Sequence, residues 1–197
     1  MEFGPQYTTA LIRWSHIFLG IMWIGFFYFM HLIVRPYLAS LDGDAKSKAY
    51  RALLARGLRW VRGTSMATLL LGLGVLGHLW SQGVYAIEGQ GLVGRGKYIM
   101  WGMTFAVAMW ANVWFFISPL QKRIVAAFEA DIGPSEADLA KAGKLGNINL
   151  YLSAPMLMLM VFAQNFPAFH YGHMGLAIVV GMIVAHILVV IARNGNN

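Results

Sequence analysis

Five stretches of apolar residues, each about twenty residues long, divide the chain, and polar residues gather between them. The stretches cover residues 14–34, 58–81, 98–117, 148–166 and 171–192. A helix needs about 20 residues to cross the roughly 30 Å hydrocarbon core of a bilayer. The stretches also lack the strict alternation of a membrane β-barrel strand. The pattern predicts an all-α integral membrane protein, a single domain over residues 1–197 with a bundle of about five transmembrane helices.

Two of the polar segments have helical character of their own. Residues 46–56 carry apolar positions on one face and basic residues elsewhere, which predicts a short helix on the lipid surface. Residues 135–144 open with Ser135, followed three residues later by Asp138, a pattern typical of a helix N-terminus. We expect the third transmembrane helix to end at Pro119.

Composition agrees with a membrane protein. Hydrophobic residues make up 58% of the chain and charged residues 12%, and the mean hydropathy is +0.59. A soluble domain carries about 25% charged residues. The sequence contains no cysteine, which excludes disulfides, iron–sulfur clusters and covalently attached c-type haem.

The basic residues predict an orientation. Three of them flank the outer ends of the apolar stretches: Arg13, Arg95 and Lys97. The other twelve share the opposite side: Arg35, Lys46, Lys48, Arg51, Arg56, Arg59, Arg62, Lys122, Arg123, Lys141, Lys144 and Arg193. The positive-inside rule then places the N-terminus outside and the C-terminus inside. Because these charges flank membrane spans, we expect contact with lipid headgroups and no nucleic-acid partner.

The outer segment at residues 82–96 is rich in glycine. It is either a mobile loop that faces a partner or cofactor, or a plain flexible connector. We expect the connector.

Histidines are the main candidates for chemistry. All six lie within or at the edge of an apolar stretch: His16, His31, His78, His170, His173 and His186. The five stretches contain no Asp and no Glu, so the acidic residues that a transporter uses are missing from them. Imidazole is a usual axial ligand of haem iron. The pattern therefore favours a redox cofactor over an ion pathway.

Helical geometry separates the histidines into an outer and an inner group. His16 and His31 are fifteen residues apart on the first helix, about 22 Å in height and about 60° in azimuth. We expect His16 to pair with His78 or His173 near the outer surface, and His31 with His186 near the inner one. This arrangement predicts one haem b at the outer level, or two with the second at the inner level.

Three arginines are placed to meet haem propionates: Arg13 on the outer side, and Arg35 or Arg193 on the inner side.

Each histidine also has a simpler interpretation. Intramembrane histidines often form hydrogen bonds between helices. His31 lies near the membrane interface, as Arg35 does, where it can reach lipid headgroups. His170 and His173 lie in a short outer turn where water can reach them. Interhelical hydrogen bonds are also what we expect of Asn112, Asn147, Asn149 and Ser153, with substrate contact as the alternative.

Three sequence blocks resemble the membrane domain of the bacterial urate hydroxylases, the urate oxidase N-terminal family. The first is Arg13-Trp14-x-His16, followed by Gly20-Ile21-x-Trp23-Ile24-Gly25 and Tyr28-Phe29. The second is Asn112-Val113-Trp114-Phe115, running into Pro119-x-Gln121-Lys122. The third is Asn149-x-x-Leu152-Ser153-x-Pro155-Met156. Of the candidate ligands, only His16 belongs to these motifs. The first helix also resembles, more faintly, that of the haem-dependent membrane protoporphyrinogen oxidase.

The resemblance implies a multi-pass protein of the bacterial inner membrane with a urate-related redox activity. Family members that act on urate join this domain to a C-terminal cytochrome c, whereas this sequence contains no Cys-x-x-Cys-His. We therefore expect a haem-b-binding subunit that passes electrons within a membrane redox complex or to a separate cytochrome c. The alternatives are an oxidoreductase acting on urate or a related heterocycle, and a structural subunit that binds lipid and protein but no cofactor.

Overall fold

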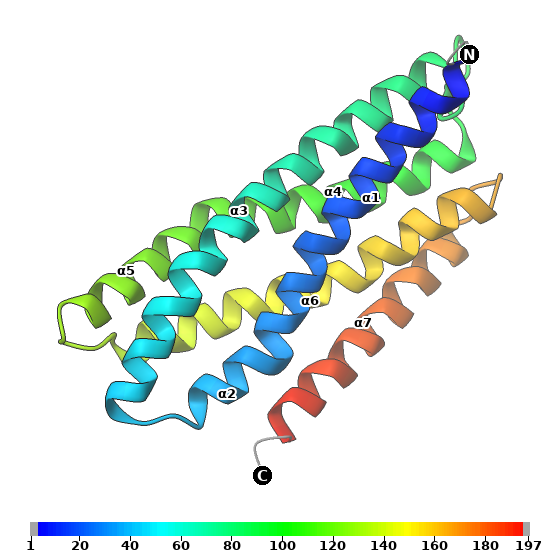
Figure 1. Cartoon of the computed structure of the whole chain (residues 1–197). Coiled ribbons are helices and arrows are strands. Elements are labelled where there is room, and N and C mark those ends of the chain that lie inside the picture. Colours follow the sequence, from blue (N-terminus) through cyan, green and yellow to red (C-terminus); the bar gives the residue numbers. More distant parts are fainter. Residues whose placement is uncertain (1–3, 195–197) are drawn as a thin grey trace.

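Five long helical columns and a small β-hairpin make up the chain in a computed structural model, which describes residues 4–194 (Figure 1). The elements are α1 (Pro5–Phe29), η1 (Met30–Val34), α2 (Arg35–Ala39), α3 (Gly43–Ser81), β1 (Ala86–Ile87), β2 (Gly91–Leu92), α4 (Gly94–Ala111), η2 (Asn112–Ile117), α5 (Ser118–Glu129), α6 (Glu136–Asn165) and α7 (Tyr171–Asn194). The segments η1 and η2 are π-helical and continue the columns in which they lie. All five columns are long and apolar enough to cross a membrane, which confirms the predicted helical membrane bundle.

The columns are longer than the apolar stretches that predicted them. Helix α3 has 39 residues and is therefore roughly 58 Å long, about twice the thickness of the hydrocarbon core. The prediction of a separate surface helix at residues 46–56 was wrong, because these residues form the first turns of α3. A single Gly57 costs a helix only about 1 kcal/mol and does not break it.

Residues 135–144 likewise begin a longer helix, α6. The predicted N-terminus is confirmed, because the Ser135 hydroxyl accepts a hydrogen bond from the Asp138 N–H at 3.1 Å. This bond satisfies one of the backbone donors that a helix start leaves without a partner.

Both π-helical segments directly precede a proline turn. Pro36 lies in the first turn of α2 and Pro119 in the first turn of α5. A proline ring inside a helix collides with the carbonyl four residues back and removes one N–H donor. In the wider turn of η2 the Ser118 N–H bonds instead to the Val113 carbonyl, five residues back. The third column therefore continues to Glu129, and the prediction that it ends at Pro119 was wrong.

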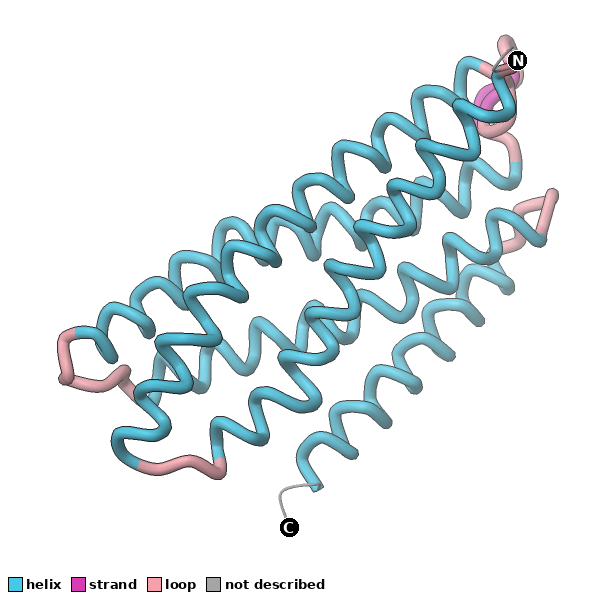
Figure 2. Tube along the Cα trace, viewed as in Figure 1, coloured by secondary structure: helices cyan, strands magenta, loops and turns pink. Residues whose placement is uncertain are grey.

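Helix α1 packs along α3, α4 along α6, and α6 along α7 (Figure 2). The central core is apolar and draws on four columns, with Trp23, Val61, Met109 and Met156 all buried. Large apolar side chains also cover the outer surface, among them Ile21, Leu70, Phe115, Leu176 and Ile183. An exposed apolar surface of this extent is what lipid contact requires.

The two ends of the bundle differ in charge. One end holds the start of α1, the hairpin and the α6–α7 turn; we call it the hairpin end (Figure 1). The other holds the α2–α3 turn, the α5–α6 turn and the end of α7 (Figure 1). The twelve clustered basic residues lie toward this second end, which we call the basic end.

The glycine-rich segment is an ordered hairpin, unlike the expected flexible connector. Strand β1 pairs antiparallel with β2, with Ala86 opposite Leu92. Gly89 has φ of +76° in the turn between them, a conformation that glycine adopts without strain. Tyr85 is only 2% exposed, and its carbonyl accepts a hydrogen bond from the Val93 N–H at 3.0 Å. The hydrogen bond closes the hairpin at its base, and the burial of Tyr85 packs it against the bundle.

Candidate functional site

A cavity of about 390 Å³ lies between α1–α2, α3, α5 and α6, toward the basic end. Its walls are mainly apolar, and none of the described residues that line it is acidic. The polar lining side chains are His31, Arg35, Lys46, Tyr50 and Gln121. The volume falls within the 300–1,000 Å³ typical of small-molecule and cofactor sites. We call this space the basic-end cavity.

His31 and Arg35 enter the cavity from the first column, and two glycines of α6 leave room for them. His31 lies in η1 and is 8% exposed. A Cβ atom on Gly146 would lie 3.1 Å from Nδ1 of His31, and one on Gly143 would overlap the Arg35 guanidinium. Residues three apart share a helix face, so α6 presents both glycines to the cavity. Larger residues at either position would displace these side chains.

Three polar lining residues were not predicted as site residues, although Gln121 belongs to the second sequence block. Lys46 and Tyr50 were assigned to a surface helix, yet on α3 they form one stripe with Leu54, four residues further on. The spacing of four was the available signal. Gln121 contributes from α5, and its side-chain oxygen is buried without a hydrogen-bond partner among the described residues. A buried acceptor of this kind is available to a bound donor.

His16 lies away from this cavity, on α1 against α3. Its Nδ1 is 3.0 Å from the Thr68 carbonyl oxygen. A carbonyl only accepts, so Nδ1–H donates and Nε2 keeps the lone pair that a metal ligand needs. The ring rests on Gly72, where an added Cβ would lie 2.9 Å from the His16 Cε1. Gly72 thus allows the close approach of α1 and α3 at this level.

The structure does not bring His78 to His16. Nε2 of His78 lies 2.8 Å from Oγ1 of Thr9 and 3.1 Å from Nε2 of Gln82. Thr9 is seven residues from His16 on the same helix, so the two imidazoles are offset by about 10 Å along the helix pair. The axial ligands of one haem must lie at the same iron atom, so this offset separates the predicted pair.

His173 and His186 also occupy separate places. Nδ1 of His173 lies 3.4 Å from the Tyr98 hydroxyl, and its ring packs on Phe166. Nδ1 of His186 lies 2.8 Å from the Tyr151 hydroxyl, and His186 is not among the residues that line the basic-end cavity. For His186 this is the interhelical hydrogen bonding that we gave as the simpler interpretation. For His173 we gave contact with water in a turn, whereas the structure places it in the first turn of α7 against Tyr98 of α4.

The predicted arginines are placed unequally. Arg35 lines the basic-end cavity beside His31, as a propionate partner would. Arg13 lies three residues before His16 on α1 and is partly exposed. The side chain of Arg193 lies outside the described part of the structure. Within that part, no three His, Asp or Glu side chains come together in a way that could hold a bare metal ion.

Polar residues of the three sequence blocks meet inside the bundle. The Tyr28 hydroxyl of the first block lies 2.8 Å from the Ser153 hydroxyl of the third. The Asn112 amide of the second block donates to Oδ1 of Asn149, in the third block, at 2.7 Å. These contacts confirm the predicted interhelical hydrogen bonds for Asn112, Asn149 and Ser153. Asn147 differs, since its side-chain oxygen is buried without a partner among the described residues.

Comparison with known families agrees with this picture. The sequence profile of the urate oxidase N-terminal family matches residues 61–194. The chain belongs to this family. The matched range contains the second and third blocks, whereas the first block and His16 precede it. No curated protein and no solved structure matches the chain.

Family membership bears differently on the two histidine sites. The match includes Gly143, Gly146 and Gln121 of the basic-end cavity but neither His31 nor Arg35. The choice of His16 as a candidate ligand depends on its motif and on the Thr68 contact. The choice of His31 depends on the cavity that surrounds it.

Proposed function

We propose that this family member is a haem-b-binding membrane subunit that passes electrons, with the basic-end cavity as its main cofactor site. His31 would supply an axial imidazole, and Arg35 and Lys46 would neutralise the propionates. A bound haem would supply a one-electron carrier within the bilayer. The electron partner would be another subunit of a membrane redox complex or a separate cytochrome c.

One observation carries the proposal: a buried histidine and two cations line one cavity whose remaining walls are mainly apolar. A haem presents a flat apolar ring, a metal that binds imidazole, and two carboxylates at one edge. The basic-end cavity offers apolar walls to the ring, the His31 imidazole to the iron, and the Arg35 and Lys46 cations to the carboxylates. The described residues contain no group of three side chains that could hold a bare metal ion, but haem does not need one, because the porphyrin supplies four nitrogen ligands itself.

His16 supports a second site near the hairpin end. Its Nδ1–H is held by the Thr68 carbonyl, the kind of outer contact that orients metal-ligating histidines and leaves Nε2 for the metal. The ligand opposite His16 would have to come from a residue other than His78. Two sites at different depths would carry an electron across part of the membrane.

The orientation follows from charge. The basic end would face the cytoplasm of a bacterial inner membrane, so that α1 begins outside and α7 ends inside. The basic-end cavity would then lie at the cytoplasmic side, and His16 toward the outer side.

The test is a reduced-minus-oxidised visible spectrum of the purified protein. Wild type should show the α band of a b-type haem, and His31→Ala should lose the part of it that the basic-end cavity binds. His170→Ala is the matched control and should keep the full band, because His170 lines no part of the cavity. A folded, colourless wild-type protein would refute haem binding and leave the structural subunit as the function. An unchanged band in His31→Ala would refute this site.

A second candidate function is oxidation of urate or a related heterocycle, with a cytochrome c as acceptor. Family membership and the cationic cavity favour it, because urate is a planar anion that Arg35 and Gln121 are suited to bind. Calorimetric titration with urate would test this. Binding that Arg35→Gln abolishes and Arg123→Gln retains would support the enzyme; no heat with wild type would exclude a urate site.

A further inference from the structure

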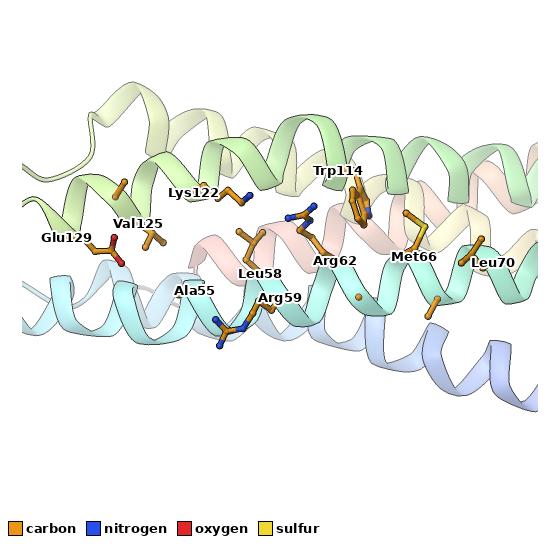
Figure 3. Close-up of a pocket in the computed structure, with 13 residues that line it drawn as sticks. Ala55, Leu58, Arg59, Arg62, Met66, Leu70, Trp114, Lys122, Val125 and Glu129 are labelled. Carbon is orange, nitrogen blue, oxygen red and sulfur yellow. The ribbon is translucent and has the colours of Figure 1, made fainter.

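A second, larger hollow of about 760 Å³ lies on the side of the bundle, between α3 and the η2–α5 column (Figure 3). Its apolar wall is formed by Leu58, Gly63, Met66, Ala67, Leu70, Val125 and Ala126. Its charged lining residues are Arg59, Arg62, Lys122 and Glu129. We call it the lateral groove.

Two cations face one another across this groove. Figure 3 shows the Arg62 guanidinium and the Lys122 amine pointing into the space between the two helices, toward each other. Glu129 lies at the far end of the view, and no ion pair with either cation is found among the described residues. Two like charges that converge in partly apolar surroundings repel unless an anion lies between them.

Arg62 is held in this position by an aromatic ring. Its guanidinium carbon lies 4.3 Å from the centre of the Trp114 ring, and Nε1 of Trp114 lies 3.3 Å from the Ser65 hydroxyl. The Nε of Arg62 is buried, with no hydrogen-bond partner among the described residues. The cation is thus oriented, and a buried donor is left for a bound acceptor.

The apolar wall continues from these cations toward the middle of the membrane. Arg62 and Leu70 are eight residues apart on α3, which corresponds to about 12 Å. This length is most of the roughly 15 Å that the acyl chain of one leaflet occupies, half of the hydrocarbon core. A small soluble anion would bind the cations but leave the apolar wall uncovered, so a ligand that fits the whole groove carries an apolar chain.

We infer that the lateral groove is a binding site for an anionic diacyl phospholipid. Its phosphate lies between Arg62 and Lys122, and one acyl chain lies along Gly63, Met66 and Leu70. Basic pockets between transmembrane helices are known to bind anionic headgroups. The inference uses none of the residues of the basic-end cavity except Leu58, which lines both spaces, and it stands independently of haem binding.

The test is retention of lipid by native mass spectrometry of the protein from mixed phosphatidylglycerol and phosphatidylcholine. Wild type should retain one phosphatidylglycerol in preference to phosphatidylcholine. Arg62→Gln with Lys122→Gln should weaken this retention about thirtyfold. The matched control removes two charges elsewhere, Arg56→Gln with Lys141→Gln, both exposed and outside the groove. It should retain the lipid as wild type does.

A second variant blocks the groove without changing its charge. A Cβ on Gly63 would meet no atom within 4 Å, and Gly63 lines the groove, so we expect Gly63→Leu to keep the fold and to place its side chain in the groove. It should also reduce phosphatidylglycerol retention, and a gel-filtration peak like that of wild type would show that the fold is intact. Equal retention of both lipids by wild type, equal loss in the Arg56 and Lys141 control, or full retention by Gly63→Leu would each overturn the inference.

Discussion

The side-chain amide of Asn112 donates to Oδ1 of Asn149 at 2.7 Å, between the third column and α6. Asn112 also donates to the Leu145 carbonyl at 3.0 Å, and Asn149 donates to the Met109 carbonyl at 3.2 Å. Both amides are buried, with exposures of 8% and 0%. Because a buried amide that loses one of its hydrogen-bond partners is costly, the two residues stabilise this helix contact together.

Replacing either residue of this pair should destabilise the bundle. Asn112→Ala and Asn149→Ala should each lower the free energy of unfolding by about 1–3 kcal/mol, since each leaves buried polar groups unpaired. The double variant should show a coupling of about 0.6–1.7 kcal/mol. Unfolding with sodium dodecyl sulfate in mixed micelles measures all three. Asn165→Ala is the control with little effect, because Asn165 is exposed and bonds only within its own helix. Strictly additive single changes would contradict the pairing.

Gly146→Val should displace His31, because even a Cβ at this position lies 3.1 Å from its Nδ1. We expect an unfolding free energy lower by about 1–3 kcal/mol, and a haem content well below that of wild type. The haem-to-protein ratio of the purified variant measures the second effect. Gly175→Val is the control, since a Cβ there meets no atom within 4 Å. If both variants hold haem equally, His31 is not the ligand.

Gly72→Ala and Gly74→Ala should differ although they lie two residues apart on α3. A Cβ on Gly72 would press on the His16 ring, which the Thr68 carbonyl holds in place, whereas a Cβ on Gly74 meets no atom within 4 Å. Gly72→Ala should lose about 1–3 kcal/mol of stability. Gly74→Ala should be neutral or gain up to about 1 kcal/mol from its higher helix propensity. Unfolding curves of the two variants in mixed micelles compare them, and equal values would show that His16 does not pack as described.

The orientation can be read with single cysteines, because the sequence has none of its own. Glu88→Cys lies in the hairpin turn and Lys141→Cys in the first turns of α6, at opposite ends of the bundle. In intact cells a membrane-impermeant maleimide should label position 88, and position 141 only after lysis. The reverse labelling would place the basic end outside.

Much of the helical architecture was predictable because it depends on local chemistry. A run of about twenty apolar residues must form a helix in lipid, where every backbone group needs an internal partner. Ser135 likewise marked the start of α6 by its own hydroxyl. The prediction failed where two neighbouring segments join into one continuous helix. Pro119 ends no column, because it lies in the first turn of α5, directly after a π-helical turn in which the Ser118 N–H bonds to the Val113 carbonyl.

The candidate site was predictable only in part. The sequence placed His31 and Arg35 together on the inner side, and the structure places both in one cavity. The predicted partner of His31, His186, lies elsewhere, against Tyr151. The sequence also suggested that His16 and His78 meet, which their depths on α1 and α3 prevent. Depth on one helix can be counted from a sequence, but the register between two helices depends on how their side chains pack.

The sequence by itself determined that this protein is a five-column helical bundle suited to a membrane, with its positive charge toward one end and its histidines within or beside the apolar spans. These properties follow from the transfer of side chains between water and lipid, which depends on composition and order alone. The tertiary structure decided which side chains meet: Asn112 with Asn149, His31 with Gly146, and Arg62 with Trp114. Each contact joins residues far apart in the chain, and its position is set by close packing between helices, which local sequence does not encode.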